Sequence, residues 1–247
     1  DPYEARDCII KYRPDVMTCD IEMPKMNGIE FISRLLPQYP LPVIIISSVS
    51  DAVFDALAAG AVDFVAKPDA ATANGINILA DELISKVIAA AAAKIGKTAG
   101  SPQNTIVKPL RSEKINFDKN KIIAIGSSTG GTEALFGILK TLPPEIPGIV
   151  ITQHIPPVFS ERMNRDTALD VKEARGGEII EPGKVFIAPG GKHLKVRKAG
   201  GRYKTELYEG ERVNGNCPSV DILFLSVAKE CGKNAVGVIL TGMGRDG

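Results

Sequence analysis

The chain has 247 residues, of which 44% are hydrophobic and 24% are charged. Thirty basic residues against 29 acidic ones give a net charge of +1, which predicts neither nucleic acid nor an anionic membrane as a partner. No stretch approaches the ~18 apolar residues of a membrane span, and the amino-terminal DPYEARD lacks the features of a signal peptide. Composition therefore predicts a globular protein without membrane insertion, long enough for two domains.

Cysteine usage indicates the compartment. Cys8, Cys19, Cys217 and Cys231 form no CxxC pair, and the two histidines add no zinc-ligand spacing. Two of the cysteines lie in apolar runs and are expected to be buried thiols. This usage is typical of a reducing cytoplasm, so we expect a cytoplasmic protein, with a monomer as the default state.

The amino-terminal half alternates short apolar runs with helical patterns. The runs cover residues 15–20, 42–47 and 62–68, and the helical patterns cover 28–36 and 51–61. Apolar strands separated by roughly 10 to 15 helical residues are typical of a parallel sheet covered on both faces, which is an α/β fold. In such sheets function collects at the carboxyl ends of the strands. Those ends carry Asp20, Ser47 and Lys67.

A carboxylate, a hydroxyl and an ammonium at three strand ends suit phosphoryl transfer, although polar loop starts alone can produce the same residues. The stretches PDVMTCDIEMPKMNG, IIISS and DFVAKP, in this order, resemble a two-component receiver domain. The resemblance implies a flavodoxin-like, doubly wound fold. It implies Asp20 as the phosphorylated residue, Ser47 as the switch hydroxyl and Lys67 as the receiver lysine.

The resemblance departs at the front of the chain. Receivers open with a strand that ends in an acidic pair holding Mg²⁺, whereas residues 1–12 resemble the second receiver helix. We therefore expect a receiver that lacks its first strand and helix. Asp20 and the backbone carbonyl of Glu22 would then form an incomplete metal site, although the complete protein would use Mg²⁺ for phosphorylation.

A helix and a connector are expected to close the receiver. Apolar residues at helical spacing predict an amphipathic helix over residues 76–94. They are Ile76, Leu79, Ala80, Leu83, Ile84, Val87 and Ile88. The following GKTAGSPQNTIVKPLRSEKINFDKNK loses this periodicity and has the composition of a connector. The expected organisation is a receiver over 1–95, a linker over 96–119 and a second domain over 120–247.

The stretch GSSTGG, residues 126–131, lies between the apolar strand KIIAIG and a helix expected to begin near Thr132. It matches neither the GxGxxG of a dinucleotide turn nor the GK[ST] of a phosphate loop. Residues 126–130 do form a GxSxG frame. This frame places Ser128 at a helix amino terminus, where free N–H groups can stabilise an oxyanion. A plain turn with a serine cap is the alternative that the frame alone leaves open.

A serine nucleophile needs a base and a supporting carboxylate. The histidines are His154, after the apolar GIVITQ, and His193, in the hairpin-like PGGKHLKVR; Asp246 follows the strand NAVGVIL. Ser128, His154 and Asp246 thus each follow a separate strand, and we expect them to converge at the carboxyl edge of one parallel sheet. Their order along the chain differs from that of the α/β-hydrolases, which argues against an ordinary lipase or esterase.

The carboxyl-terminal half also resembles a known family. The segments IAIGSSTGGTEAL, VITQHIPP, IAPGGKH, PSVDILFLSVAK and GVILTGMGRDG resemble the catalytic domain of the CheB-type response regulators, and a receiver followed by a linker is the same family's layout. The resemblance implies a Rossmann-like three-layer domain with a Ser-His-Asp mechanism and no cofactor for hydrolysis. Ser128 would be the nucleophile, His154 the base and Asp246 the residue that orients it. Thr129 and Met243 would line the site, with the Met243 N–H assisting the oxyanion.

This resemblance implies a phosphorylation-regulated protein-glutamate methylesterase and protein-glutamine glutaminase that acts in the adaptation of bacterial chemotaxis. The expected partners are methylated chemoreceptor cytoplasmic domains and a chemotaxis histidine kinase as phosphodonor. The unphosphorylated receiver is expected to cover the Ser128 site. Two other outputs remain open on the residues alone: nucleotide binding by GSSTGG, and DNA binding, for which no helix-turn-helix or basic stripe follows the linker.

The sequence differs from the family pattern at three places, and these differences affect the predicted site. The segment VNGNCPSVD replaces a basic, histidine-bearing one, which is expected to alter the grip on an acidic receptor surface. The helix VFSERMNRD is shorter than the family pattern. The sequence stops one residue beyond Asp246, so we expect a domain without its carboxyl-terminal part, in which few contacts hold Asp246.

Overall fold

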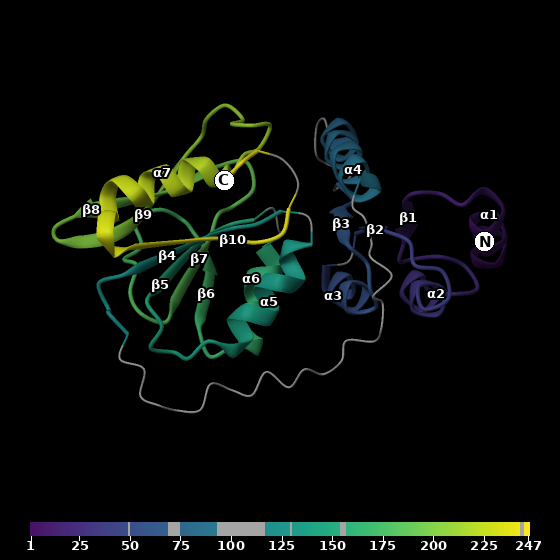
Figure 1. Ribbon diagram of the computed structural model, residues 1–247, viewed down its shortest axis with the longest axis horizontal. Coiled ribbons are helices and arrows are strands. Elements are labelled where there is room, and N and C mark those ends of the chain that lie inside the picture. The colour runs from purple at the N-terminus through teal and green to yellow at the C-terminus, as the bar shows by residue number, and fades with distance from the viewer. Residues whose placement is uncertain (49, 69–74, 93–116, 129, 154–156, 243–244) are drawn as a thin grey trace. The chain divides into compact units, whose positions relative to one another are not determined.

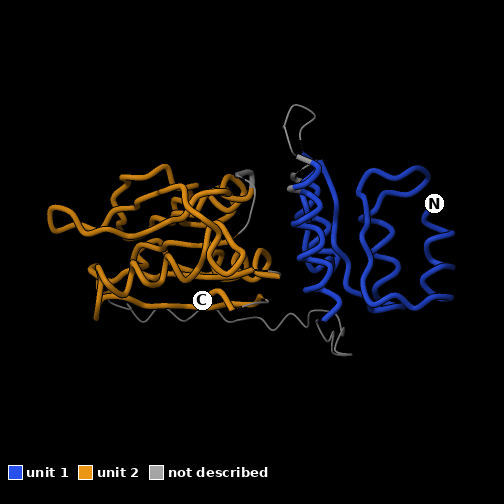
Figure 2. The backbone as a smooth tube through the Cα atoms, turned by 90° about the horizontal axis from the view of Figure 1, so that it is seen from above, with its two compact units in different colours: residues 1–107 blue, residues 108–247 orange. Residues whose placement is uncertain are grey.

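The computed structural model describes residues 1–48, 50–68, 75–92, 117–128, 130–153, 157–242 and 245–247 (Figure 1). The chain divides into two compact units, residues 1–107 and 108–247 (Figure 2). Each unit is built around a parallel sheet, so the predicted α/β class is confirmed. Most of the predicted linker, up to residue 116, lies outside the described residues.

The first unit alternates helices and strands along the chain. Its elements are α1 (Pro2–Tyr12), β1 (Met17–Asp20), α2 (Gly28–Leu35), β2 (Val43–Ser47), α3 (Ser50–Ala58), β3 (Asp63–Ala66) and α4 (Gly75–Ala92). The strands form a parallel sheet in the order β1-β2-β3. The register pairs Asp20 with Ile46 and Ser47 with Ala66, so these polar residues stand at one edge of the sheet.

Only some of the apolar residues that predicted helix α4 pack against this sheet. Leu79, Leu83 and Val87 pack on the buried cluster of Ile44, Val65 and Ala90. A packed helix buries a stripe about 100° wide, and apolar residues outside that stripe stay exposed. Those residues are Ile76, Ile84 and Ile88. The helix is therefore confirmed, whereas its buried face is narrower than the sequence pattern indicates.

The second unit has a larger sheet. Its elements are β4 (Ile122–Gly126), α5 (Gly131–Thr141), β5 (Gly148–Thr152), α6 (Pro157–Asp166), β6 (Asp170–Glu173), β7 (Lys184–Ile187), β8 (His193–Ala199), β9 (Arg202–Tyr208), α7 (Val220–Cys231), the short 3₁₀ helix η1 (Gly232–Asn234) and β10 (Ala235–Ile239). Five strands form a parallel sheet in the order β10-β4-β5-β7-β6, and β8 pairs with β9 in an antiparallel hairpin. The three strands predicted to carry the site, β10, β4 and β5, are neighbours.

Helices and the hairpin cover the two faces of this sheet. Helices α5 and α6 lie on one face, and α7 lies with the β8–β9 hairpin on the other (Figure 1). The core on the α7 side joins residues of the central strands to the hairpin and the helix, among them Ala124, Val150, Leu194 and Leu223. This packing fixes the start of α7 next to the end of β4, which matters for the site described below.

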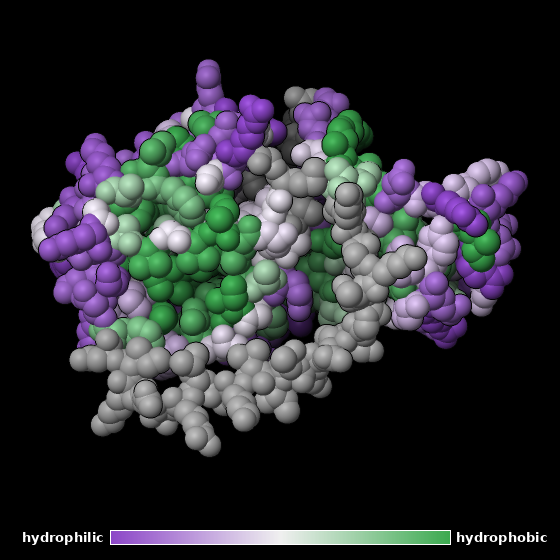
Figure 3. Space-filling model, in the orientation of Figure 1, coloured by the Kyte–Doolittle hydropathy of each residue, from purple (hydrophilic) through white to green (hydrophobic). Residues whose placement is uncertain are grey.

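The edge strand β10 is more exposed than its neighbours. Val236 is 38% exposed and Ile239 is 56% exposed, and Leu225 on α7 is 68% exposed. Figure 3 shows a hydrophobic area over this part of the second unit. Within the part of the chain that the structure describes, no helix combines the length and hydrophobicity needed to cross a membrane.

Candidate active site

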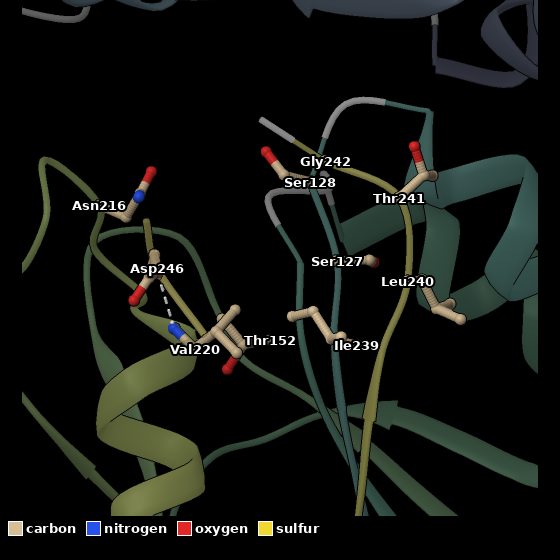
Figure 4. A pocket seen from close by; sticks show the side chains of 10 residues that line it. All are labelled: Ser127, Ser128, Thr152, Asn216, Val220, Ile239, Leu240, Thr241, Gly242 and Asp246. Atoms are coloured by element: carbon tan, nitrogen blue, oxygen red, sulfur yellow. Dashed lines mark hydrogen bonds between the residues drawn. The ribbon is translucent and has the colours of Figure 1, made fainter. Parts of the chain in front are cut away.

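The turn after β4 sends two adjacent serines in different directions. Ser127 is only 4% exposed, and its hydroxyl donates a hydrogen bond to Gln153 Oε1. The amide nitrogen of Gln153 in turn donates to the Ser128 carbonyl oxygen at 3.2 Å. The Ser128 hydroxyl points away from the strands (Figure 4) and forms no hydrogen bond with any other described residue. The Ser127 hydroxyl is therefore held inside the fold, whereas the Ser128 hydroxyl has no partner among the described residues.

Two glycines of GSSTGG allow close packing around this turn. A Cβ at Gly131 would lie 2.6 Å from both Gln153 Oε1 and Ser127 Oγ, so a larger residue would push into the buried hydrogen bond. A Cβ at Gly126 would lie 2.3 Å from Val220 Cγ1, at the start of α7. These glycines are needed for the approach of neighbouring protein atoms, which explains the motif without a bound phosphate.

The backbone holds Ser128 between two strands. The Ser127 N–H donates to the Thr152 carbonyl oxygen at 3.1 Å, and the Ser128 N–H donates to the Thr241 carbonyl oxygen at 3.0 Å. Helix α5 begins directly afterwards at Gly131, and no side chain caps its amino terminus. Ser128 thus stands beside the positive end of a helix dipole, which favours developing negative charge.

Asp246 is held firmly by the amino terminus of α7. Its Oδ1 accepts hydrogen bonds from Ser219 Oγ at 2.6 Å and from the Asp221 N–H at 3.0 Å, and its Oδ2 accepts from the Val220 N–H at 2.8 Å. The expectation that few contacts hold Asp246 is therefore wrong. It overlooked the free N–H groups that the first turn of a helix presents to a nearby carboxylate.

The hydrogen bonds of Asp246 leave capacity for one more donor. A carboxylate offers about four lone-pair sites. Two donors contact Oδ1 and one contacts Oδ2, so one site on Oδ2 is unused by the described residues. An imidazole N–H is a donor of the kind that this site accepts.

Ser128 and Asp246 line the same pocket, which has a volume of about 120 Å³ (Figure 4). Its other lining residues are Ser127, Thr152, Asn216, Val220, Ile239, Leu240, Thr241 and Gly242. Thr129, His154 and Met243, which the sequence also pointed to, lie outside the described residues. The structure thus brings together Ser128 and Asp246, which are 118 positions apart along the chain.

Sequence reasoning missed several residues that build this site. Ser219 is the N-cap of α7, with its Oγ accepting from the Ile222 N–H, and a serine directly before an apolar helical pattern is a recognisable signal for such a cap. Gln153 and Asn216 carried no comparable signal. Their positions depend on contacts made across the sheet.

The polar residues of the first unit also converge. Lys67 Nζ lies 2.5 Å from Asp20 Oδ2, and the Glu22 N–H donates to Asp20 Oδ1 at 3.1 Å. The Lys67 N–H donates to the carbonyl oxygen of Ser47, and Ser47 is only 3% exposed. Burial, reinforced by the Asp20 carboxylate, raises the pKa of the adjacent Cys19 thiol to about 11. The edge therefore holds one carboxylate that is already paired with an ammonium.

A divalent cation fits this edge poorly. Mg²⁺ prefers six oxygen ligands in an octahedron. Only two of the described residues at this edge, Asp20 through its carboxylate and Glu22 through its backbone carbonyl, would supply such oxygens. Nowhere among the described residues do three or more His, Cys, Asp or Glu side chains gather as they would around a metal ion. The described residues at this edge therefore do not supply the ligands that Mg²⁺ needs.

These two edges define the class of protein. One unit carries the carboxylate, hydroxyl and lysine of a receiver, and the other carries a serine-bearing strand-to-helix turn that shares a pocket with a half-buried carboxylate. Together they describe a response regulator whose second unit is an α/β domain with a hydrolase-like site.

Comparisons with known proteins agree with this class. The family described as response regulator receiver domain matches residues 1–75, and the family described as CheB methylesterase matches residues 123–247. A protein-glutamate methylesterase/protein-glutamine glutaminase 2 from Syntrophomonas wolfei is 49% identical over 251 residues, covering 100% of this chain and 72% of that protein. A protein-glutamate methylesterase/protein-glutamine glutaminase from Syntrophotalea carbinolica is 48% identical over 257 residues, covering 100% of this chain and 73% of that protein.

Among solved structures, the CheB methylesterase catalytic domain of Thermotoga maritima is 39% identical, with a TM-score of 0.49, over 51% of this chain and 70% of that one. The matched families and relatives together place the chain plainly: it belongs to the CheB family of protein-glutamate methylesterases/protein-glutamine glutaminases that carry a receiver domain. The alternatives of a nucleotide-binding or DNA-binding output domain are thereby set aside.

Proposed function

We propose that this chain hydrolyses γ-methyl esters of glutamate residues in chemoreceptor cytoplasmic domains, and deamidates glutamines there, as the adaptation enzyme of bacterial chemotaxis in the cytoplasm. Family membership supports this activity. The observation that supports the site assignment is the contrast between the two serines: the Ser128 hydroxyl lies in a pocket with Asp246 and has no partner among the described residues, whereas the Ser127 hydroxyl is buried and bonded.

The reaction would follow the logic of a serine hydrolase. His154 takes the proton of Ser128 Oγ, and the oxygen attacks the ester carbonyl carbon. The tetrahedral intermediate collapses as the methanol oxygen leaves with the proton from His154, which leaves a glutamyl ester on Ser128. Water, deprotonated by His154, then attacks this ester and releases the glutamate carboxylate. With a glutamine substrate, ammonia leaves in place of methanol.

Other groups would stabilise the charges of this reaction. Asp246 would accept the second N–H of His154 at the unused site on Oδ2, which fixes the tautomer of the imidazole. The developing oxyanion would lie near the uncapped amino terminus of α5, with Thr129 and the Met243 N–H lining the site. The pocket of about 120 Å³ suits a side-chain ester, whereas pockets for larger ligands are about 300–1,000 Å³.

Regulation would operate through Asp20. A chemotaxis histidine kinase donates the phosphoryl group, and the Lys67 ammonium and Ser47 hydroxyl then bind phosphoryl oxygens in place of the present Asp20 to Lys67 pair. This change shifts the receiver between a state that covers the Ser128 site and a released one.

Separate Ser128→Ala and Ser127→Ala variants test the nucleophile assignment. We expect Ser128→Ala to lower methanol release from a methylated receptor fragment by on the order of 10⁴-fold or more. Ser127→Ala should stay within about tenfold of the unmodified chain, because only a supporting hydrogen bond is lost. Equal losses in both variants, or no loss in either, would remove Ser128 from this role.

A further inference from the structure

His193, the second histidine of the chain, is completely buried between the hairpin and α7. It begins β8, its residue is 0% exposed, and its ring stacks on Tyr208 with 5.1 Å between the ring centroids. It does not line the pocket that Ser128 and Asp246 share. Any influence of His193 on that pocket must therefore act through other residues.

The partners of its ring nitrogens fix its protonation. Nε2 lies 2.9 Å from the carbonyl oxygen of Glu211, and a carbonyl oxygen can only accept, so Nε2 carries the hydrogen. The Ser219 N–H donates to Nδ1 at 3.2 Å, so Nδ1 presents its lone pair. His193 is thus a neutral imidazole held in one tautomer by two backbone groups.

Ser219 connects this ring to Asp246. Its residue is 0% exposed; its N–H contacts His193, and its hydroxyl donates to Asp246 Oδ1 at 2.6 Å. The next two amides, of Val220 and Asp221, complete the grip on the carboxylate. The acceptor provided by His193 therefore anchors the residue at which the Asp246 cradle begins.

We propose that His193 is a positioning residue for Asp246, acting through Ser219 and the first turn of α7. A buried N–H strongly requires an acceptor, so removing Nδ1 would draw Ser219 toward another partner and shift the donors that hold Asp246. This inference rests on the proposed function, because the position of Asp246 matters for turnover only if Asp246 orients the catalytic base.

Two isosteric variants separate the bonds of the ring. In His193→Asn the side-chain oxygen can take the place of Nδ1 and keep the Ser219 N–H, while the Glu211 partner is lost. In His193→Gln the terminal amide nitrogen can take the place of Nε2 and keep the Glu211 carbonyl, while Ser219 loses its acceptor. Both variants lose the stacking on Tyr208 and leave one backbone group unpaired, and asparagine, the smaller side chain, loses more packing than glutamine.

The first readouts are kcat for methanol release and the rate at which a fluorophosphonate labels Ser128. We expect both to fall by on the order of 10²-fold in His193→Gln, the size of effect that a small misplacement of a catalytic group produces. His193→Asn should stay within about threefold of the unmodified chain, and KM should change by less than about twofold in either variant.

The second readout is independent of activity. Hydrogen exchange of the Val220 and Asp221 amides should be at least about tenfold faster in His193→Gln than in His193→Asn, because these amides donate to Asp246. Ser226→Ala is the control. Its hydroxyl accepts from the Val196 N–H at 3.0 Å and so joins α7 to β8 away from the cradle. We expect this variant to lose stability with unchanged labelling of Ser128.

A slow His193→Gln beside near-normal His193→Asn and Ser226→Ala supports the proposal. Equal slowing of both His193 variants, or normal labelling and exchange in His193→Gln, overturns it. If the unmodified chain neither labels at Ser128 nor releases methanol, the proposed function fails instead. The exchange comparison then still decides whether His193 positions the Asp246 cradle.

Discussion

Polar side chains gather at the carboxyl edge of each parallel sheet, but the two edges differ in whether the group proposed to react is paired. At the first edge Asp20, the proposed phosphorylation site, is paired with the Lys67 ammonium, and both side chains are about one-third exposed. At the second edge the hydroxyl of Ser128, the proposed nucleophile, has no described partner, while the Ser127 hydroxyl donates to Gln153 and Asp246 accepts three hydrogen bonds. Within the described residues, the group proposed to react is paired at the first edge and unpaired at the second.

The difference follows from what each group must do. A phosphorylated carboxylate is a switch, so its unmodified form should be stable and its partners should be able to rearrange around a phosphoryl group. A catalytic hydroxyl gains from surroundings that are already fixed before the substrate arrives, because reorganisation during the reaction adds to the barrier. We therefore expect substitutions at the second edge to lower kcat and the free energy of unfolding far more than substitutions at the first edge.

The largest effect is expected at Asp246. Asp246→Asn keeps the size of the side chain but favours the wrong imidazole tautomer, so we expect kcat to fall by on the order of 10³- to 10⁴-fold. Methanol release measures the loss. Asp221→Asn is the control, since it removes a nearby carboxylate while keeping the backbone N–H that contacts Asp246. A similar loss in both variants would show a general effect of charge at the start of α7.

A smaller effect is expected at Gln153. Gln153→Met preserves volume but leaves the buried Ser127 hydroxyl without its acceptor and removes one of the two donors to the Ser128 carbonyl, of which the Gly131 N–H remains. We expect a destabilisation of about 2 kcal/mol in urea unfolding and a fall in kcat of roughly 10- to 100-fold. Unchanged turnover together with lost stability would mean that the amide supports the fold without positioning Ser128.

The glycines of α5 provide a matched pair. Gly131→Ala places a methyl group 2.6 Å from Ser127 Oγ and Gln153 Oε1, so we expect a destabilisation of about 1–3 kcal/mol. Gly137→Ala, in the same helix, meets no atom within 4 Å and should stabilise by about 0.5–1 kcal/mol. Urea unfolding of the two variants measures both signs. Equal signs would contradict the close packing around Ser127.

The smallest effect is expected at the first edge. Lys67→Ala removes the partner of Asp20, but a pair of this exposure contributes little, so the free energy of unfolding should change by less than about 1 kcal/mol. Basal methanol release should stay unchanged, while phosphorylation of Asp20 should no longer alter it. A loss of stability above about 2 kcal/mol would show that the Asp20–Lys67 pair is as important for the fold as the contacts at the second edge, and would contradict the proposed difference between the edges.

Much of the architecture was readable from the sequence. Apolar runs predicted β2, β4, β5 and β10, and the spacing of Leu79, Leu83 and Val87 predicted the packed side of α4. Strands β6 and β7 were not predicted. Strand β6 reads DVKE and carries no clear apolar signal, whereas β7 reads KVFI and its short apolar run was overlooked. The expectation that Ser128 and Asp246 lie near each other followed from the rule that polar residues after parallel strands meet at one edge, and the two residues do line one pocket.

The sequence by itself determined the α/β class and the residues that end each strand, because periodicity and turn chemistry are local properties. Only the tertiary structure decided the strand order, which of two adjacent serines is buried and bonded, and that Asp246 rests on the first turn of α7. The last two outcomes depend on hydrogen bonds between residues about 26 positions apart, such as Ser127 to Gln153 and Ser219 to Asp246. Such bonds form only when the sheet, helices and hairpin pack together, so a local sequence pattern does not predict them.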